Sequence, residues 1–271
     1  MAASEGVDLE WAIVEYTRVQ MNKQKKLTRK YSSKIQEQAK KCVAHLTKAL
    51  GKSFDIYHSD ENVPGIGSIY AKPEPKTDIV AVKGGKRYFI SVKMAGGIQL
   101  ASGQGASTAE LFEAAATDAK IINPKVLKSI VQELNTMPTR LLSEANLPRI
   151  KEEGNKKVID EFIKGGKIIQ DKNYEYWVKN NKPVLLNALL KFVKENVTFY
   201  DALIKEALTG KTTLKAFRGA PATHIISPSG FYEINDAYVK KIKTKIKMDV
   251  RAKSRGGISA VAFRIETSGS V

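Results

Sequence analysis

Residues 77–93 read TDIVAVKGGKRYFISVK, and this stretch decides the fold that the sequence predicts. Two runs rich in Val, Ile, Tyr and Phe flank Gly84-Gly85, which is typical of a β-hairpin with a tight turn. Such a turn places Asp78 opposite Ser91, and because side chains alternate along a strand, Lys93 shares their face. The pattern predicts that an acid, a hydroxyl and an amine meet at one end of a rigid hairpin.

These residue types suit the hydrolysis of a phosphodiester bond. A carboxylate such as Asp78 is a ligand for a hard cation such as Mg²⁺, for which Mn²⁺ can substitute. The cation activates water and neutralises the charge that grows on the phosphate, while a lysine such as Lys93 positions or deprotonates that water. The site needs at least one further carboxylate.

Thr77-Asp78, a gap of twelve residues and then Ser91-Val92-Lys93 resemble the signature of the PD-(D/E)XK nuclease superfamily. That superfamily includes restriction endonucleases, Holliday-junction resolvases and phage nucleases. The resemblance implies an α/β restriction-endonuclease-like core and a metal-dependent endodeoxyribonuclease, with Asp78 and Lys93 in its active site. Two positions depart from the signature: Thr77 replaces proline, and Ser91 replaces an acid that would be a metal ligand.

Some restriction enzymes of the superfamily carry an S-x-K variant, in which a glutamate of the following helix supplies the missing carboxylate. The matching candidates here are Glu110 and Glu113. Ser107 and Glu110 have the spacing of a capping box that opens a helix, so Glu113, one turn further on, is preferred. Members often add an acid from the first helix, which would be Glu10, with Glu15 as a further candidate.

Gln99 and Ser91 complete the predicted site. Gln99 follows Lys93 by six residues and resembles the polar residue that often follows this lysine in these nucleases, where it orients water or binds phosphate. Ser91 would stand in the place of the motif acid. Each role has an alternative: Gln99 could be an ordinary loop residue, and Glu10 could simply complement the dipole at a helix N-terminus.

The rest of the chain predicts elements around this hairpin. Apolar residues at helical intervals predict two helices between residues 9 and 50, with Gly51 ending the second. A further helix is expected from 107 to about 122, followed by an almost wholly helical stretch from 124 to 208.

The C-terminal part is expected to be β-rich. Strands are predicted at 224–227 and 230–234, and a second hairpin consists of 241–253 and 258–266. We therefore expect an α/β fold whose central mixed sheet contains both hairpins. Residues 1–120 would form the N-terminal part of the nuclease core, 121–208 a helical insertion, and 209–271 the part that completes the core and contacts DNA.

The chain has a large excess of positive charge, with 45 Lys and Arg against 28 Asp and Glu, a net charge of +17. Such a charge attracts polyanions, and DNA is the leading partner. The candidate surface that grips the DNA backbone is the second hairpin, whose basic residues are Lys243, Lys245, Lys247, Arg251, Lys253 and Arg255. The alternative is that these lysines protect an edge strand from aggregation.

Composition also bears on location and on other kinds of site. One cysteine, Cys42, cannot form an internal disulfide, and no apolar run is long enough for a membrane helix or arranged as a signal peptide. We therefore expect an intracellular, cytoplasmic protein. His58 and His224 lack the sequence partners of an HNH or Ser-His-Asp site.

Two functions remain open at this point. The first is a Mg²⁺-dependent DNA endonuclease, either of the restriction type or one for phage genome processing or recombination. The second is a catalytically silent DNA-binding or structural protein that keeps the nuclease fold, which the serine at position 91 favours. Many relatives cut two strands as dimers, so a homodimer is expected by analogy only.

Overall fold

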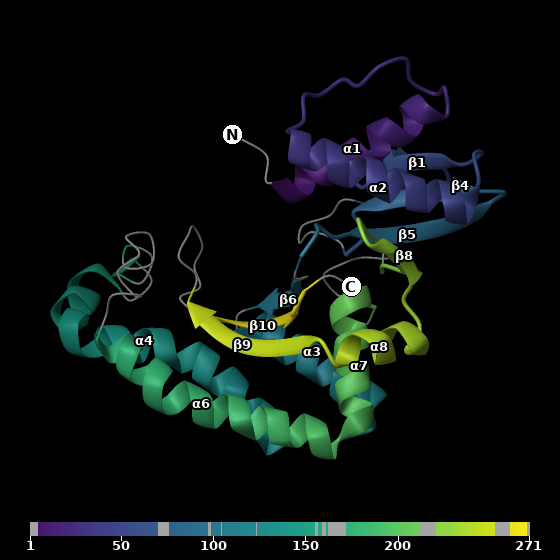
Figure 1. Cartoon of the computed structure of the whole chain (residues 1–271). Helices are drawn as coiled ribbons and strands as arrows, with labels where there is room; N and C mark the ends of the chain where they lie inside the picture. The colour runs from purple at the N-terminus through teal and green to yellow at the C-terminus, as the bar shows by residue number, and fades with distance from the viewer. Residues whose placement is uncertain are drawn as a thin grey trace. The chain divides into compact units, whose positions relative to one another are not determined.

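The structure is a computed structural model that describes residues 5–69, 76–96, 99–103, 105–122, 124–154, 157–158, 161, 172–211, 221–252 and 261–269. Its helices are α1 Glu5–Gln20, α2 Ser33–Leu50, α3 Gly105–Asp118, α4 Lys125–Glu153, α6 Lys172–Glu195, α7 Val197–Thr209 and α8 Asp236–Lys243. Its strands are β1 Asp55–His58, β2 Asn62–Val63, β3 Gly67–Ser68, β4 Ile79–Lys83, β5 Lys86–Val92, β6 Gln99–Gly103, β7 His224–Ser227, β8 Gly230–Glu233, β9 Ile246–Ala252 and β10 Val261–Thr267 (Figure 1).

The chain divides into two compact units that are not continuous in sequence. The first unit comprises Met1–Ile98, Ile204–Ile246 and Thr267–Val271, and the second comprises Gln99–Leu203 and Lys247–Glu266. These bounds differ from the expected segments, because residues 99–120 group with the helical stretch rather than with the first hairpin. No helix in the described ranges combines the length and the apolar character that a membrane span requires.

The first unit contains a five-stranded sheet in the order β1-β4-β5-β7-β8. β5 and β7 are parallel, with Ser91 opposite Ile225, and the other neighbouring strands are antiparallel. The predicted fold class, α/β with a mixed central sheet flanked by helices, is confirmed. The hairpin that decided this prediction supplies the central strand β5 and its neighbour β4.

The helices α1 and α2 cover this sheet with apolar side chains. Ile13 of α1 and Leu46 of α2 are fully buried in one core with Ile79 and Ile90 of the hairpin. Burial of each such side chain contributes about 2 kcal/mol. The helix α2 ends as predicted at Gly51, whose φ of +76° is a backbone conformation that glycine adopts without strain. The hairpin is therefore held rigidly from the side that faces α1 and α2.

The second unit has its own sheet and helices. Its sheet has the order β6-β10-β9, so the second predicted hairpin lies here and not in the central sheet, and that part of the expectation was wrong. The ring of Phe112 from α3 lies 5.2 Å from that of Phe263 on β10, which joins helix and sheet in one apolar core. A short amphipathic hairpin can pack on either sheet, so its sequence alone did not identify its partner.

The expected strand 241–253 begins later than predicted, because residues 241–243 belong to the helix α8. Residues 241–247 alternate between lysine and other residues, which predicted a strand. In the structure Asn235 accepts a hydrogen bond from the backbone N–H of Tyr238 at 3.0 Å and caps α8. Tyr238, Val239 and Ile242 then form one buried helical face, and β9 begins only at Ile246. The cap and this apolar spacing outweigh the alternation.

Candidate active site

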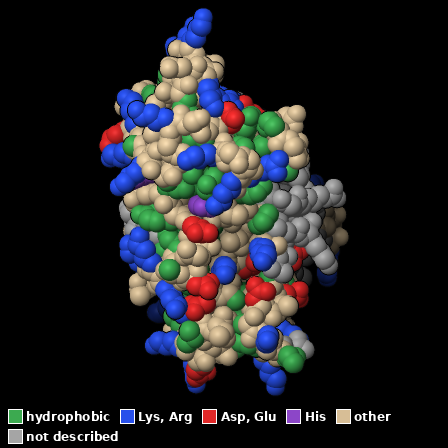
Figure 2. All heavy atoms as spheres, turned by 90° about the vertical axis from the view of Figure 1, so that its right-hand side faces the viewer, with side chains coloured by type: hydrophobic (Ala, Val, Ile, Leu, Met, Phe, Trp, Pro, Cys, Tyr) green, Lys and Arg blue, Asp and Glu red, His purple; other side chains and the backbone are tan. Residues whose placement is uncertain are grey.

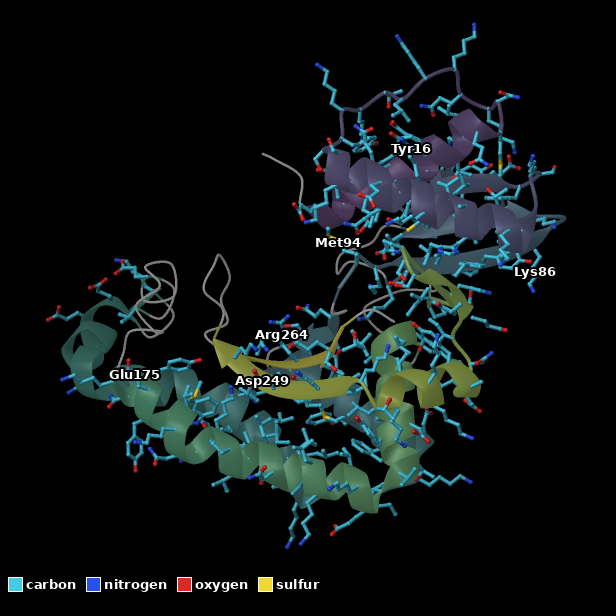
Figure 3. All side chains as sticks on the ribbon, viewed as in Figure 1. Tyr16, Lys86, Met94, Glu175, Asp249 and Arg264 are labelled. Carbon is cyan, nitrogen blue, oxygen red and sulfur yellow. The ribbon has the colours of Figure 1, made fainter. Side chains whose placement is uncertain are left out.

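The β4–β5 hairpin has the predicted register. Ile79 pairs with Ile90 and Val80 with Phe89, which is the alignment that a two-residue turn requires. The turn residues Gly84 and Gly85 have φ values of +54° and +78°, as a tight hairpin turn with two left-handed residues demands. In Figure 3, Lys86 and Met94 mark the two ends of this second strand, and the candidate site lies at the Met94 end.

Asp78 is fixed by hydrogen bonds from the neighbouring strand. Its Oδ2 accepts from the backbone N–H of Val92 at 2.6 Å and from the hydroxyl of Ser91 at 3.1 Å. Its backbone N–H donates to the carbonyl of Ile90, and its carbonyl accepts from the N–H of Ser59. Ser91 is buried and donates to the carboxylate, so here it positions Asp78. The predicted pairing of Asp78 with Ser91 is confirmed.

Lys93 and Glu10 both influence the ionisation of Asp78. The pKa of Asp78 is raised to about 6: burial has the largest effect and raises it, the charge of Lys93 lowers it, and the charge of Glu10 raises it. Lys93 continues the pairing of β5 with β7 through its backbone N–H, which donates to the carbonyl of Ile226 at 2.8 Å. The charges of Glu10 on α1 and of Lys93 therefore both act on Asp78 within the first unit.

Glu10 has a partner that the sequence did not reveal. Its Oε2 lies 3.2 Å from Nε2 of His58, which is almost fully buried. The backbone N–H of Asp60 donates to Nδ1 of His58 at 3.1 Å, so the ring carries its proton on Nε2 and donates it to Glu10. The indole of Trp11 stacks on the same ring at 4.1 Å. Forty-eight residues separate Glu10 from His58, and no local motif links them.

Glu15, the further candidate on α1, has a different use. Its side chain is buried and accepts from the backbone N–H of Thr28 at 3.0 Å and from that of Arg29 at 3.4 Å. It also accepts from the hydroxyl of Thr28. The carboxylate of Glu15 thus holds the loop between α1 and α2.

The remaining predicted acids lie in the second unit. Glu110 and Glu113 are both exposed on α3. The capping-box prediction was wrong, because α3 begins at Gly105, two residues before Ser107. A Cβ at Gly105 would lie only 1.8 Å from Oδ1 of Asn135, so this glycine allows α3 to approach α4 closely. No geometric relation between these glutamates and Asp78 follows from the structure.

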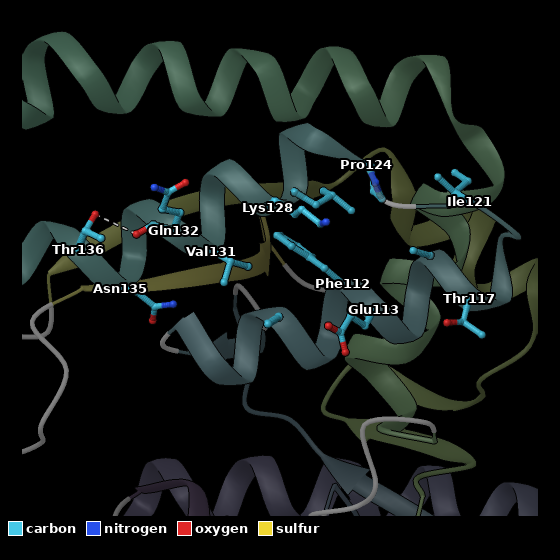
Figure 4. Close-up of a pocket in the computed structure, with 13 residues that line it drawn as sticks. Phe112, Glu113, Thr117, Ile121, Pro124, Lys128, Val131, Gln132, Asn135 and Thr136 are labelled. Carbon is cyan, nitrogen blue, oxygen red and sulfur yellow. Dashed lines mark hydrogen bonds between the residues drawn. The ribbon is translucent and has the colours of Figure 1, made fainter.

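A cavity of about 780 Å³ lies between α3 and α4, and Glu113 is on its wall (Figure 4). Its lining is otherwise mainly apolar and amide side chains, including Phe112, Val131 and Gln132. Across the described residues, no group of three or more His, Cys, Asp or Glu side chains is arranged to hold a metal ion. In the first unit, Glu10 acts electrostatically on Asp78, so these two carboxylates are the candidates there.

Gln99 is the first residue of β6 and not a loop residue. Its Oε1 accepts a hydrogen bond at 2.8 Å from Nη2 of Arg264 on β10. Because Gln99 begins the second unit, a role beside Lys93 stays a prediction.

The predicted DNA-gripping residues are divided between elements. Lys243 ends α8, Lys245 follows it, and Lys247 and Arg251 lie on β9, while Lys253 and Arg255 fall outside the described residues. The guanidinium of Arg251 is already paired with Asp249 at 2.6 Å and with Glu266 at 2.8 Å. These two carboxylates compete with phosphate for Arg251. More widely, Lys and Arg are spread over the face in Figure 2 with acids between them.

Comparisons with known proteins give one distant likeness. No protein-family model and no curated protein matches the sequence. The solved structure of the restriction endonuclease MspI in complex with its cognate DNA is similar, with a TM-score of 0.41 and 10% sequence identity. The similarity covers 85% of this chain and 79% of that chain.

The substitution Glu10→Gln tests the effect of the negative charge of Glu10 while nearly preserving the shape of its side chain. Glu10→Gln keeps an oxygen that can accept from His58 but removes the charge that raises the pKa of Asp78. If Glu10 holds a divalent cation, the Mg²⁺ concentration for half-maximal DNA cleavage should rise about 10- to 100-fold. A titration of cleavage rate against Mg²⁺ measures this. Glu37→Gln, an exposed change on α2, is the matched control, and equal curves for the two variants would exclude Glu10 as a ligand.

Proposed function

We propose that this chain is a divalent-metal-dependent endonuclease that hydrolyses phosphodiester bonds in DNA. The observation that carries the proposal is the electrostatic coupling of Asp78, Glu10 and Lys93 at the end of a rigid hairpin. The charge of Glu10 raises the pKa of the buried Asp78, so the two carboxylates form a local excess of negative charge. A cation relieves that repulsion, and hard divalent cations prefer such oxygen donors.

The donor set fits Mg²⁺ or Mn²⁺ in part. Both hydrogen bonds that the side-chain carboxylate of Asp78 receives from described residues reach Oδ2, so Oδ1 is the oxygen that would bind a cation. Glu10 would supply a second carboxylate oxygen, oriented by His58. Glu113 and Glu110, which belong to the second unit, are the further candidates for a third donor. When bound, the cation supplies Lewis acidity and a more acidic water.

The residues of this chain then have separate tasks. Ser91 and the N–H of Val92 hold Asp78 in one rotamer. The ammonium of Lys93 would orient the attacking water and balance the charge of the phosphate. The net charge of +17 accelerates the encounter with DNA.

A silent DNA-binding protein is the second candidate, and Ser91 is the observation that favours it. A buried serine stands where the superfamily signature has an acid, so one ligand of the usual set is missing from the hairpin. In that case Asp78 and Glu10 would be retained with the fold but would not hold a metal ion.

Cleavage of supercoiled plasmid by the full chain decides between the two. We expect nicked and linear products with Mg²⁺ or Mn²⁺ and intact plasmid with EDTA. Binding of plasmid without cleavage in either metal would instead establish the silent protein. Gel filtration of the active preparation, with and without a DNA duplex, tests the expected homodimer.

A further inference from the structure

We propose that the loop between α1 and α2, residues 21–32, is a docking surface for the phosphate backbone of DNA. This loop, called the basic loop below, lies in the first unit with Asp78 and Glu10. The inference rests on the proposed function for its substrate, but it concerns binding and not cleavage. It assigns to this loop the contact that the sequence placed on the C-terminal hairpin.

The basic loop concentrates positive charge, only part of which is paired with acids of the described residues. Residues 21–34 contain no Asp or Glu, and their basic residues are Lys23, Lys25, Lys26, Arg29, Lys30 and Lys34. At the two ends, Lys23 pairs with Asp55 at 2.5 Å and Lys34 pairs with Glu5 at 2.7 Å. Among the described side chains, none forms an ion pair with the exposed residues Lys25, Lys26 and Lys30. Figure 3 shows long side chains projecting outward from this loop.

Hydrogen bonds with other residues fix the conformation of the basic loop, and they leave Lys25, Lys26 and Lys30 exposed to solvent. The buried carboxylate of Glu15 accepts hydrogen bonds from the backbone N–H groups of Thr28 and Arg29. The ammonium of Lys23 donates a hydrogen bond to the carbonyl of Phe54 at 2.8 Å. A buried carboxylate is costly unless it is hydrogen-bonded, so Glu15 and this loop conformation require each other. A cationic surface fixed before binding loses little conformational entropy when it meets a polyanion.

A continuous set of contacts joins the basic loop to the candidate active site. The guanidinium of Arg29 lies over the ring of Trp11, 3.9 Å from its centroid. Trp11 stacks on His58, and His58 donates to Glu10. DNA held by the basic loop therefore runs beside the helix that carries Glu10. Lysine, a compact charge with no planar fork, suits backbone contact without base recognition.

Binding of a fluorescent DNA duplex, measured by anisotropy in EDTA over a series of salt concentrations, tests the proposal without cleavage. In a variant with Lys25→Gln, Lys26→Gln and Lys30→Gln, we expect binding at least about tenfold weaker. The slope of log K against log salt should fall by about 2 to 3, close to one per lost phosphate contact. All three side chains are exposed, so the variant should fold like the wild type.

The matched control is Lys48→Gln, Lys52→Gln and Lys83→Gln, which removes the same charge from exposed positions of the first unit. These residues lie near Gly51, at the other end of α2, which as an 18-residue helix spans about 27 Å. An equal loss of DNA affinity in both triple variants would overturn the proposal, because it would show that only the net charge of the protein matters. Unchanged DNA binding combined with lost binding to phosphatidylserine vesicles would also overturn it. A wild type that binds no DNA contradicts the proposed function itself.

Discussion

Asp78→Asn is expected to reduce plasmid cleavage by at least about a thousandfold, equivalent to about 4 kcal/mol of activation free energy. Asparagine keeps the shape of aspartate and an oxygen that can accept from Val92 and Ser91, but it is a poor ligand for Mg²⁺. The measurement is the single-turnover rate of plasmid nicking with saturating metal. Asp118→Asn, at the end of α3, is the control for a lost carboxylate elsewhere.

The same substitution should stabilise the metal-free protein, because the Asp78 carboxylate is costly in its folded surroundings. Its pKa is raised from 3.8 to about 6, so the folded state holds this proton more tightly than the unfolded state. The wild type therefore loses stability, relative to the variant, as pH rises from about 4 to about 6. Above pH 6 the gain in Asp78→Asn should be constant, at about 1 to 3 kcal/mol.

Urea unfolding in EDTA at pH 4 and pH 8 measures this difference. We expect nearly equal midpoints for the two proteins at pH 4 and a higher midpoint for Asp78→Asn at pH 8. A variant that is less stable than the wild type at pH 8 would show that the Asp78 charge is favourable in the folded state. The electrostatic basis of the proposed metal site would then be lost.

Lys93→Met is expected to slow cleavage by about 100- to 1,000-fold, as is typical when a group that positions or deprotonates the attacking water is lost. Methionine has nearly the length of lysine and no charge. Lys86→Met, at the turn end of the same strand, is the control for removing a lysine from the hairpin. The single-turnover rate of nicking at saturating Mg²⁺ is again the measurement. Equal rates for Lys93→Met and Lys86→Met would remove Lys93 from the mechanism.

A second readout separates a chemical role of Lys93 from a structural one. Lys93 lowers the pKa of Asp78, so its removal should raise that pKa and destabilise the metal-free protein at pH 8. In an Asp78→Asn background this part of the destabilisation should disappear, because no carboxylate is left to respond. A double-mutant cycle at pH 8 without metal therefore measures the coupling of the two residues. Strictly additive effects would indicate that Lys93 acts only through packing.

Some elements of the fold could be predicted because their signals are local. Gly84-Gly85 between two β-rich runs determined a hairpin and its register, and the apolar spacing of residues 33–50 determined α2. The predicted starts of α3 and of the strand after residue 240 were wrong. Gly105 at the start of α3 lies against Asn135, which is a contact between residues far apart in the chain. The cap of α8 by Asn235 is local, but it is not part of the apolar pattern from which the strand was predicted. Contacts of this kind are not expressed in the periodicity of a segment.

By itself, the sequence determined that Asp78, Ser91 and Lys93 share one end of a hairpin, because strand alternation and a two-residue turn leave no other register. It also determined the net charge of +17, which attracts polyanions. Only the tertiary structure decided that Glu10 and His58 meet beside Asp78, that Glu15 holds the basic loop, and that the second hairpin belongs to another sheet. Those pairings join residues that are far apart along the chain, and packing between elements selects them.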